Sequence, residues 1–279
     1  MLSEKSIGTL LGREVDSIDR LNGQAGKRIY RVRARGRQYC IKSGSGAAVD
    51  MLAYEATGLH RIESTRSVRV PKLIASEEGV LAMEWIDETA PTARAWRTLG
   101  ESLAKLHSTG HGRYGFEMDG FCGNSVQRNQ WKDDGIDFFI SQRIEPQVKM
   151  ARDRGLLSRG NLSRINILVS RLSTLIPEQR PVLVHGDLWS GNVLFGASGP
   201  LVIDPAIHYG WAEADLAMTC LFGSFHRDFY AAYFSGGGHW AEFEQRKDLY
   251  NCYHLLNHLN LFGTAYHKPL MAIVRRFAH

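Results

Sequence analysis

The sequence predicts an α+β protein with two lobes, a small β-rich lobe over residues 1–86 and a larger, mainly helical lobe over residues 87–279. Short β-prone runs separated by turn residues dominate the first third of the chain, whereas apolar residues at helical spacing dominate from Thr92 onward. With 44% hydrophobic and 23% charged residues, the composition suits a globular protein, and 279 residues suffice for two lobes.

The first lobe is expected to combine several strands with one helix. Residues 29–32 and 39–41 are β-prone, and residues 79–83 form another strand-like run. Residues 70–74 should be extended, because Pro71 disfavours the helical conformation in the residue before it. Apolar residues recur at helical spacing over residues 49–63, so we expect a helix there.

The second lobe is expected to be helical around one polar loop. The spacing predicts helices over residues 92–107, 134–152 and 162–175, with Pro146 starting or kinking the second of them. Residues 110–130 contain glycine and asparagine and should form a loop. Short strands at 182–184 and 201–203 flank the polar loop, and the chain after Asp215 should be mostly helical.

Charge and cysteine content narrow the class of protein. Lys plus Arg number 34 against 29 for Asp plus Glu, and no run of like charges indicates a nucleic-acid partner. We expect neither a secretory signal nor a membrane span, because no apolar stretch is long enough. The four cysteines form no CxxC pair, so their spacing predicts neither a disulfide scaffold nor a zinc site. Together these features predict a cytoplasmic protein.

The residues with the clearest chemical meaning lie in and after the polar loop. His185 is followed by Asp187, then by Asn192 five positions later, and Asp204 ends the next strand. Phosphoryl transfer from ATP requires a carboxylate that accepts the proton of the attacking hydroxyl, and hard oxygen ligands for Mg²⁺. We therefore predict Asp187 as the catalytic base and Asn192 and Asp204 as Mg²⁺ ligands, on the kinase pattern H-x-D-x-x-x-x-N. The alternative is a polar turn whose side chains only cap backbone groups.

The small lobe offers candidates for binding ATP. Lys42 ends a β-prone run and Glu55 lies on the following helix, the pair that holds the α- and β-phosphates in kinases. Gly23 and Gly26 lie in a stretch between two strand-like runs, where backbone N–H groups could approach phosphate, although an ordinary hairpin explains them nearly as well. At residues 83–86, where the lobes should join, we expect the Glu84 carbonyl and the Ile86 N–H to bind adenine.

Residues 185–192 read H-G-D-L-W-S-G-N, which resembles the hallmark of the fructosamine (ketosamine) kinases. Residues 123–147, 204–218 and 253–263 resemble the same family, so the similarity spans nearly the whole chain. The resemblance implies a two-lobed protein-kinase-like fold, ATP as donor, and the sugar 3-hydroxyl of a ketosamine such as ribulosyl- or fructosyl-lysine as acceptor. It also implies that Asp215 braces the catalytic loop. The chain departs from the family at Trp211-Ala212, where His-Arg is common, and in its glycine loop.

Two interpretations remain open for several side chains. Trp189 and Trp131 could contact the sugar or pack in the core. Residues 257, 258 and 260 (Asn, His, Asn) could bond in the interior or line the acceptor cleft. His185 is expected to orient the loop, and His107 to pack or cap a helix.

Two rival functions follow from the same residues. An aminoglycoside- or choline-type phosphotransferase shares the motif, and a pseudokinase would keep the fold without turnover. Only ten residues separate Asp204 from Asp215, too few for a phosphorylation-controlled loop, so we expect a constitutively assembled small-molecule enzyme. We also expect a monomer. Cys40 should share a strand face with Lys42, which allows either redox control or a plain apolar role.

Overall fold

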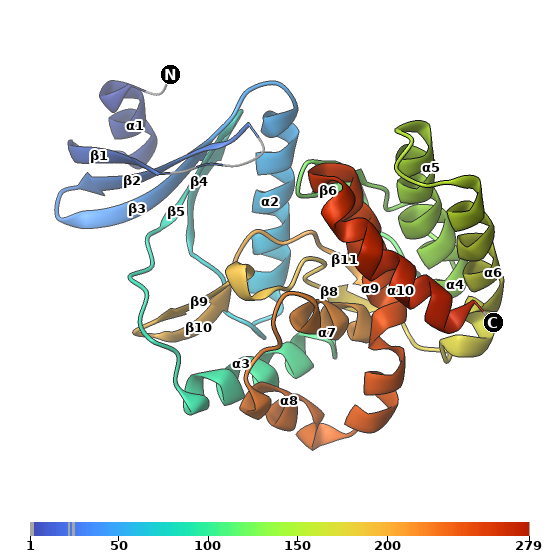
Figure 1. Ribbon diagram of the computed structural model, residues 1–279. Coiled ribbons are helices and arrows are strands. Elements are labelled where there is room, and N and C mark those ends of the chain that lie inside the picture. Colours follow the sequence, from blue (N-terminus) through green and yellow to red (C-terminus); the bar gives the residue numbers. More distant parts are fainter. Residues whose placement is uncertain (1–2, 22, 24–25, 279) are drawn as a thin grey trace.

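The computed structural model describes residues 3–21, 23 and 26–278. An antiparallel five-stranded sheet forms the N-terminal part, in the spatial order β1-β2-β3-β5-β4 (Figure 1). The strands are β1 (Val15–Leu21), β2 (Arg28–Ala34), β3 (Arg37–Ser43), β4 (Leu73–Glu77) and β5 (Val80–Glu84). The predicted strands at 29–32, 39–41 and 79–83 are all present. The extended segment at 70–74 becomes a strand only from Leu73 onward.

One helix of this part was not predicted. Helix α1 (Glu4–Leu11) is capped by the Ser3 side chain and ends at Gly12, which has a left-handed conformation. Its buried residues Ile7 and Leu11 pack with Tyr30, Val32 and other inward residues of the sheet as a small separate core. The serine cap and the terminal glycine are sequence signals of a helix, so this element could have been predicted.

Helix α2 (Ala47–Ser64) connects the sheet with the rest of the molecule (Figure 1). Gly58 lies so near Pro205 that a Cβ there would be 2.8 Å from the proline ring. The Tyr54 ring lies so close to Gly120 that a Cβ at Gly120 would overlap it. The Tyr54 hydroxyl donates a hydrogen bond to the Ile207 carbonyl. These contacts place α2 against the segment that carries Asp204.

The second part of the chain is mainly helical. Its helices are α3 (Ala93–Leu106), α4 (Gly135–Phe138), α5 (Glu145–Asp153), α6 (Arg159–Leu175), α7 (Ala212–Leu221), α8 (Arg227–Tyr233), α9 (Trp240–Phe262) and α10 (His267–Phe277). The helix predicted over 134–152 is divided by a π-helical turn, Phe139–Ile144, and Pro146 lies in the first turn of α5, which begins at Glu145. Proline lacks an N–H, so it fits the first turn of a helix.

Three short two-stranded sheets lie among these helices. Strands β9 (Val193–Gly196) and β10 (Gly199–Val202) pair with each other, and β8 (Val182–Val184) pairs with β11 (His208–Gly210), which was not predicted. The loop predicted over 110–130 contains a hairpin, β6 (Gly120–Cys122) and β7 (Ser125–Gln127), so that prediction was wrong there. Its three-residue strands are too short to show a period in the sequence.

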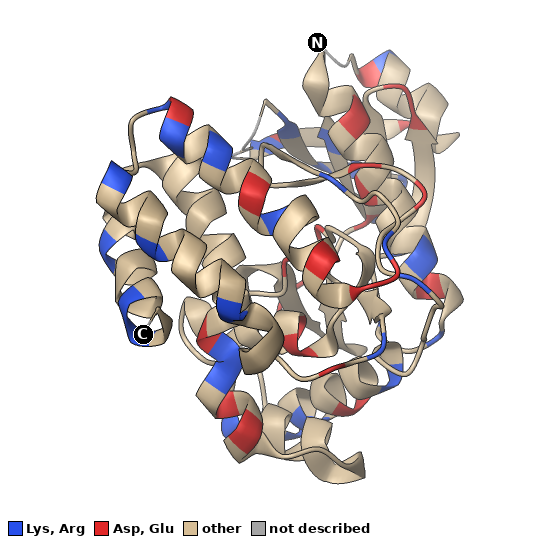
Figure 2. Cartoon of the chain, turned by 90° about the vertical axis from the view of Figure 1, so that its right-hand side faces the viewer, with Lys and Arg blue, Asp and Glu red and all other residues tan. Residues whose placement is uncertain are grey.

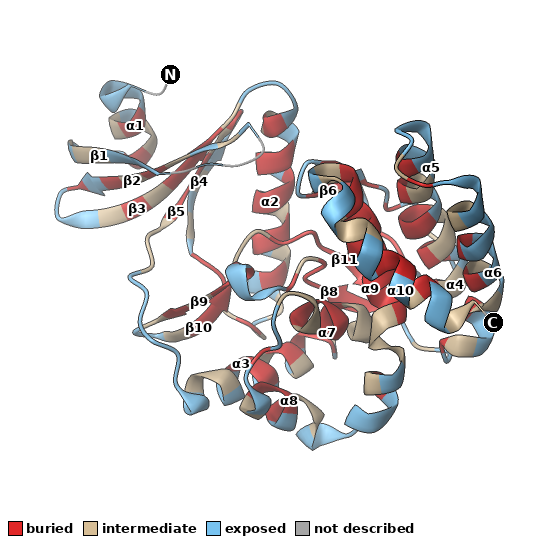
Figure 3. Cartoon of the chain, in the orientation of Figure 1, coloured by how far each residue is buried: buried red, intermediate tan, exposed pale blue. Residues whose placement is uncertain are grey.

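The distribution of buried and exposed residues follows from this arrangement of helices and strands. Buried residues run along α2, α7 and α9, and exposed residues lie on the outer faces (Figure 3). Lys and Arg are interspersed with Asp and Glu along the helices of the second part (Figure 2). Among the described residues, no helix combines the length and hydropathy needed to cross a membrane. All four cysteines are free.

Candidate active site

The loop between β8 and β9 is held by buried hydrogen bonds of His185. This imidazole is fully buried, and its Nε2 lies 2.9 Å from the Ile203 carbonyl oxygen. Its Nδ1 accepts from the Asp187 N–H at 3.3 Å. Burial lowers the pKa of His185, so the neutral ring with its proton on Nε2 satisfies both contacts. His185 therefore joins the loop to the segment between β10 and Asp204, and it is not free to react.

Asp215, at the start of α7, binds the same loop from the other side. Its carboxylate accepts the backbone N–H of His185 at 2.6 Å and that of Gly186 at 2.7 Å. His107, which caps α3, lies 3.2 Å away and also contacts the Tyr233 hydroxyl at 2.7 Å. Although burial alone raises the pKa of Asp215, the bonds from His107 and the backbone lower it overall, so the carboxylate stays ionised. His107 is thus a packed, capping histidine.

Asp187 and Asn192 lie side by side in this loop. The Asn192 amide nitrogen donates to the Asp187 carbonyl at 2.8 Å and to its carboxylate at 3.3 Å. This arrangement leaves Oδ1 of Asn192 as the atom free to bind a ligand. Burial, followed by the nearby Asp204 charge, raises the pKa of Asp187 to about 7 despite the Asn192 bond. A carboxylate with a pKa near neutrality is suited to act as a general base.

Asp204 forms an ion pair with Lys42, which also contacts Glu55 at 2.5 Å. Asp204 has a φ of 53°, a strained conformation for a residue with a side chain. Burial raises the pKa of Asp204, but the Lys42 and Lys27 charges outweigh it and hold the pKa well below its usual range. The two carboxylates likewise raise the pKa of Lys42 against the effect of burial. The site therefore contains a charged lysine between two acidic groups.

One cavity of about 360 Å³ joins these groups. Its lining includes five of the predicted site residues, namely Glu55, Asp187, Trp189, Asn192 and Asp204. Lys42 is buried behind them and reaches the cavity through its ion pairs.

The same cavity has lining residues that the sequence did not single out. They include Lys27, Tyr54, Phe121 and Gly123. Lys27 is the last residue of the glycine stretch and lies 3.5 Å from Glu55, so its place in that stretch was an available signal. Phe121 and Gly123 lie in the β6–β7 hairpin, whose position at the cavity depends on tertiary packing and has no local signal.

The glycine stretch, residues 21–27, leads from the last residue of β1 to β2 in the sequence. Asn22, Gln24 and Ala25 lie outside the described residues. A Cβ at Gly23 would clash with the Lys27 carbonyl, and Gly26 has a φ of 74°. These two positions thus require glycine for a tight connection, and their contact with phosphate stays a prediction.

Glu84 and Ile86 lie where the sheet joins the helical part. Glu84 ends β5, and its carboxylate accepts from Arg69 at 3.1 Å and from the Lys72 N–H at 3.0 Å. Ile86 packs near Gly196 of β9, where a Cβ would be 3.0 Å from its side chain. The segment therefore leads from the sheet to the helical part, and adenine binding by its backbone stays a prediction.

The two tryptophans predicted at the substrate lie in different places. Trp189 is 38% exposed and lines the cavity, and its ring covers Gly191, where a Cβ would clash with it. Trp131 is instead stacked with His111 (ring centroids 4.7 Å apart) and with Tyr209, and it is not among the described residues that line the cavity. Its packing favours the core interpretation.

A second, more open cavity of about 650 Å³ shares Trp189 and Gly123 with the first. His258 lines it with Phe222, Phe262 and Tyr266. Asn257 and Asn260 are buried instead, where their amide groups donate to the Cys122 and Gln147 carbonyls. Of these three residues of α9, Asn257 and Asn260 therefore lie in the interior, and His258 lines the groove.

Comparison with known proteins finds similarity to one family of kinases. A family model described as fructosamine kinase matches residues 4–279. The chain is 35% identical to the chloroplastic protein-ribulosamine 3-kinase of Arabidopsis thaliana, over 85% of this chain and 74% of the relative. It is 32% identical to the ketosamine-3-kinase of Mus musculus, over 88% and 89% of the two chains.

Solved structures extend the likeness to the fold. A protein of Thermobifida fusca that bears the provisional name fructosamine-3-kinase superposes with a TM-score of 0.92 at 33% identity, over 98% of this chain and 96% of that one. The ADP-bound aminoglycoside phosphotransferase APH(2'')-Ib superposes with a TM-score of 0.66 at 14% identity, over 98% and 96%, which shows the kinase-like fold alone. Family model, relatives and site geometry lead to one conclusion: the chain belongs to the fructosamine kinase family and is an ATP-dependent kinase with an alcohol group as its acceptor.

Proposed function

We propose that this kinase transfers the γ-phosphoryl group of ATP to the 3-hydroxyl of a ketosamine such as ribulosyl- or fructosyl-lysine. The observation that carries the proposal is the shared cavity of Asp187, Asn192 and Asp204, with Lys42 and Glu55 paired beside it. The names of the 35% and 32% identical relatives support a ketosamine acceptor.

The residues present fit Mg²⁺. Asn192 offers Oδ1 because its nitrogen is engaged by Asp187, and the Asp204 side chain is 35% exposed on the cavity. Both donors are hard oxygens, which Mg²⁺ prefers. When bound, Mg²⁺ would neutralise part of the negative charge of the phosphates. We assign Asn192 and Asp204 to hold it.

The remaining groups position and deprotonate the acceptor. Asp187 accepts the hydroxyl proton as the hydroxyl oxygen forms its bond to the γ-phosphorus, and the bond from that phosphorus to the β-phosphate oxygen breaks to release ADP. Lys42, held by Glu55, steadies the phosphates. His185 and Asp215 keep the loop in place through the buried bonds described above.

The acceptor side of the cavity favours a sugar over a cationic antibiotic. Trp189 offers an exposed ring next to Asp187, and such a face suits a sugar ring. The groove beyond it is aromatic, and none of the described residues that line it is acidic. A polycationic aminoglycoside would need carboxylates there.

An acceptor panel tests the substrate class. ATP consumption is measured with ribulosyl-lysine, fructosyl-lysine, kanamycin and choline at equal concentrations, with and without Mg²⁺. We expect Mg²⁺-dependent turnover with one or both ketosamines and background rates with the others. Turnover confined to kanamycin or choline would assign a different acceptor, and no turnover with any acceptor would favour a pseudokinase.

The role of Asp187 has its own test. Asp187→Asn should reduce kcat by at least about 10³-fold, because the amide cannot accept the proton, while ATP binding persists. Asp133→Asn, at an exposed position, is the matched control. Full activity in Asp187→Asn would refute the base assignment.

The free cysteines and the origin of the whole site in one chain support a monomer in the reducing cytoplasm. Gel filtration with light scattering tests whether the protein is a monomer. A dimeric mass at micromolar concentration would contradict the proposed monomer.

A further inference from the structure

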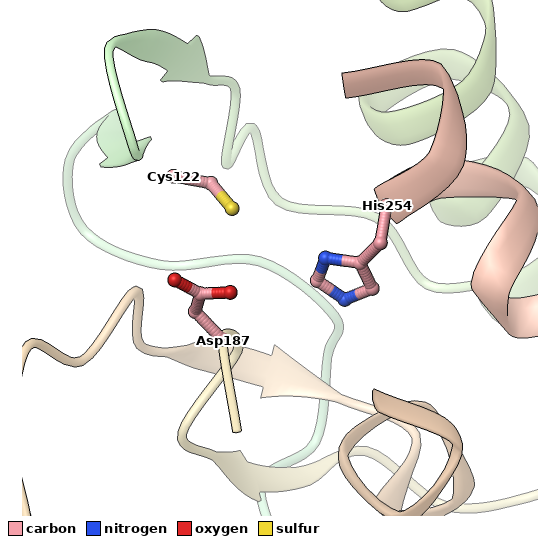
Figure 4. A group of neighbouring side chains, drawn as sticks. All are labelled: Cys122, Asp187 and His254. Carbon is pink, nitrogen blue, oxygen red and sulfur yellow. The ribbon is translucent and has the colours of Figure 1, made fainter. Parts of the chain in front are cut away.

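Three side chains from distant parts of the sequence converge behind the cavity. Cys122 ends β6, Asp187 lies in the catalytic loop, and His254 projects from α9 (Figure 4). One nitrogen, one sulfur and one carboxylate oxygen from these residues all lie within 4.8 Å of one another. The proposed phosphoryl transfer uses Asp187 but assigns no role to Cys122 or His254.

His254 has the properties of a metal ligand whose site is empty. The side chain is only 4% exposed, and its Nδ1 has no hydrogen-bond partner although it is buried. An unpartnered buried nitrogen is costly, so such atoms call for an explanation such as a bound ion. Burial, with His258 and Arg143 nearby, lowers the pKa of His254 to about 3, so the ring is neutral, as metal coordination requires.

We propose that Cys122, Asp187 and His254 form a binding site for a thiophilic divalent cation of the Zn²⁺ class, and that its occupation inhibits the kinase. The inhibition rests on the proposed function, because the ion would hold the carboxylate that accepts the substrate proton. The binding itself does not depend on that function.

The donor set matches this ion and not Mg²⁺. Sulfur, imidazole nitrogen and carboxylate oxygen are ligands of Zn²⁺, whereas Mg²⁺ requires oxygen. Sulfur, nitrogen and oxygen ligands of a tetrahedral zinc lie roughly 3.3–3.6 Å apart, so side-chain shifts of about 1 Å would close the site. Cys122 would release its proton to solvent on binding. Thiolate and carboxylate would then balance the two charges of the ion, which suits a buried place.

Direct metal binding is the first test. Co²⁺ is titrated into the metal-free full-length protein, and the thiolate-to-cobalt charge-transfer band is followed, with Zn²⁺ added to displace it. We expect a band in the parent protein, and at least about tenfold weaker binding in Cys122→Ser and His254→Gln. Cys220→Ser and His226→Gln are matched controls away from the three proposed ligands and should keep the band. Thermal unfolding verifies that each variant is folded, and Cys122→Ala serves if the serine is not.

Inhibition is the second test. Turnover is measured at constant Mg²⁺-ATP over a series of buffered free Zn²⁺ concentrations, and each protein is compared with its own zinc-free rate. Half-inhibition should need at least about tenfold more Zn²⁺ in Cys122→Ser than in the parent. A parent protein that turns over but shows no cobalt band overturns the site. A band without zinc inhibition overturns the inhibitory role, and a band in a protein without kinase activity refutes the proposed function while the site stands.

Discussion

The cavity that contains Asp187 and the aromatic groove that adjoins it at Trp189 are built from different interactions. Toward the sheet, Lys42 is buried between Glu55 and Asp204, and each contact is a directional bond between charges. Toward α9, the groove presents exposed rings, with Trp189 at 38% and Phe262 at 62% exposure. The first side defines one geometry for the phosphates, whereas the second offers area with few directional bonds.

The difference has an energetic meaning. Removing one partner of a buried ion pair costs about 3–5 kcal/mol, because it leaves an uncompensated charge. An exposed aromatic contact contributes only about 1 kcal/mol. We therefore expect the rate of phosphoryl transfer to depend strictly on Lys42, Glu55 and Asp204, which form the phosphate side. The range of acceptors should depend on the rings of the groove, which form the aromatic side. Four variants test this contrast, ordered from the largest expected effect to the smallest.

Lys42→Met should reduce kcat/KM by about 10²–10³-fold, because Glu55 and Asp204 then face each other without the cation. Steady-state kinetics with varied ATP measures the loss. Lys149→Met, at an exposed lysine, is the control. A loss below threefold in Lys42→Met would break the proposed contrast.

Asp215→Asn should reduce kcat by about 10–100-fold with little change in either KM, since the residue touches the loop and not the substrates. The amide can accept one of the two backbone N–H groups at most and loses the charge. The free energy of unfolding should fall by about 2–4 kcal/mol, measured in urea. If KM for the acceptor changes and kcat does not, Asp215 acts at the substrate instead.

Trp189→Leu should raise KM for the ketosamine by about fivefold to tenfold and leave KM for ATP unchanged, because the lost contact is a stacking face. Trp131→Leu is the matched control at a ring that stacks on His111. A rise in KM for ATP in Trp189→Leu would show that this ring belongs to the phosphate side.

The pKa of Asp187 makes stability depend on pH in a stated direction. Its pKa is about 7 in the folded protein against an ordinary 3.8, so between these values the native state binds more protons than the unfolded chain. The free energy of unfolding therefore falls as pH rises through this window. Asp187→Asn should be more stable than the parent by at least about 1 kcal/mol at pH 8 in the absence of Mg²⁺, and the gain should vanish near pH 4. Urea unfolding at both pH values checks this, and an equal gain at both would contradict it.

Local signals in the sequence determined much of this protein. The spacing of His185, Asp187 and Asn192 predicted one polar loop, and the two-residue period of β3 placed Cys40 on the face of Lys42. Burial raises the pKa of Cys40 to about 11, which favours its apolar role over redox control. These predictions succeeded because each depends on residues a few positions apart, where chain geometry alone sets the distance.

The tertiary structure alone decided which distant side chains meet. The β6–β7 hairpin brings Phe121 and Gly123 to the cavity, and α9 brings His254 to Cys122 although 131 residues lie between them in the sequence. The spacing of the cysteines excluded a zinc motif, because a motif records only neighbours along the chain. Contacts of this kind arise from the burial of whole helices against each other, and that free energy is shared by many apolar residues with no pattern at the site itself.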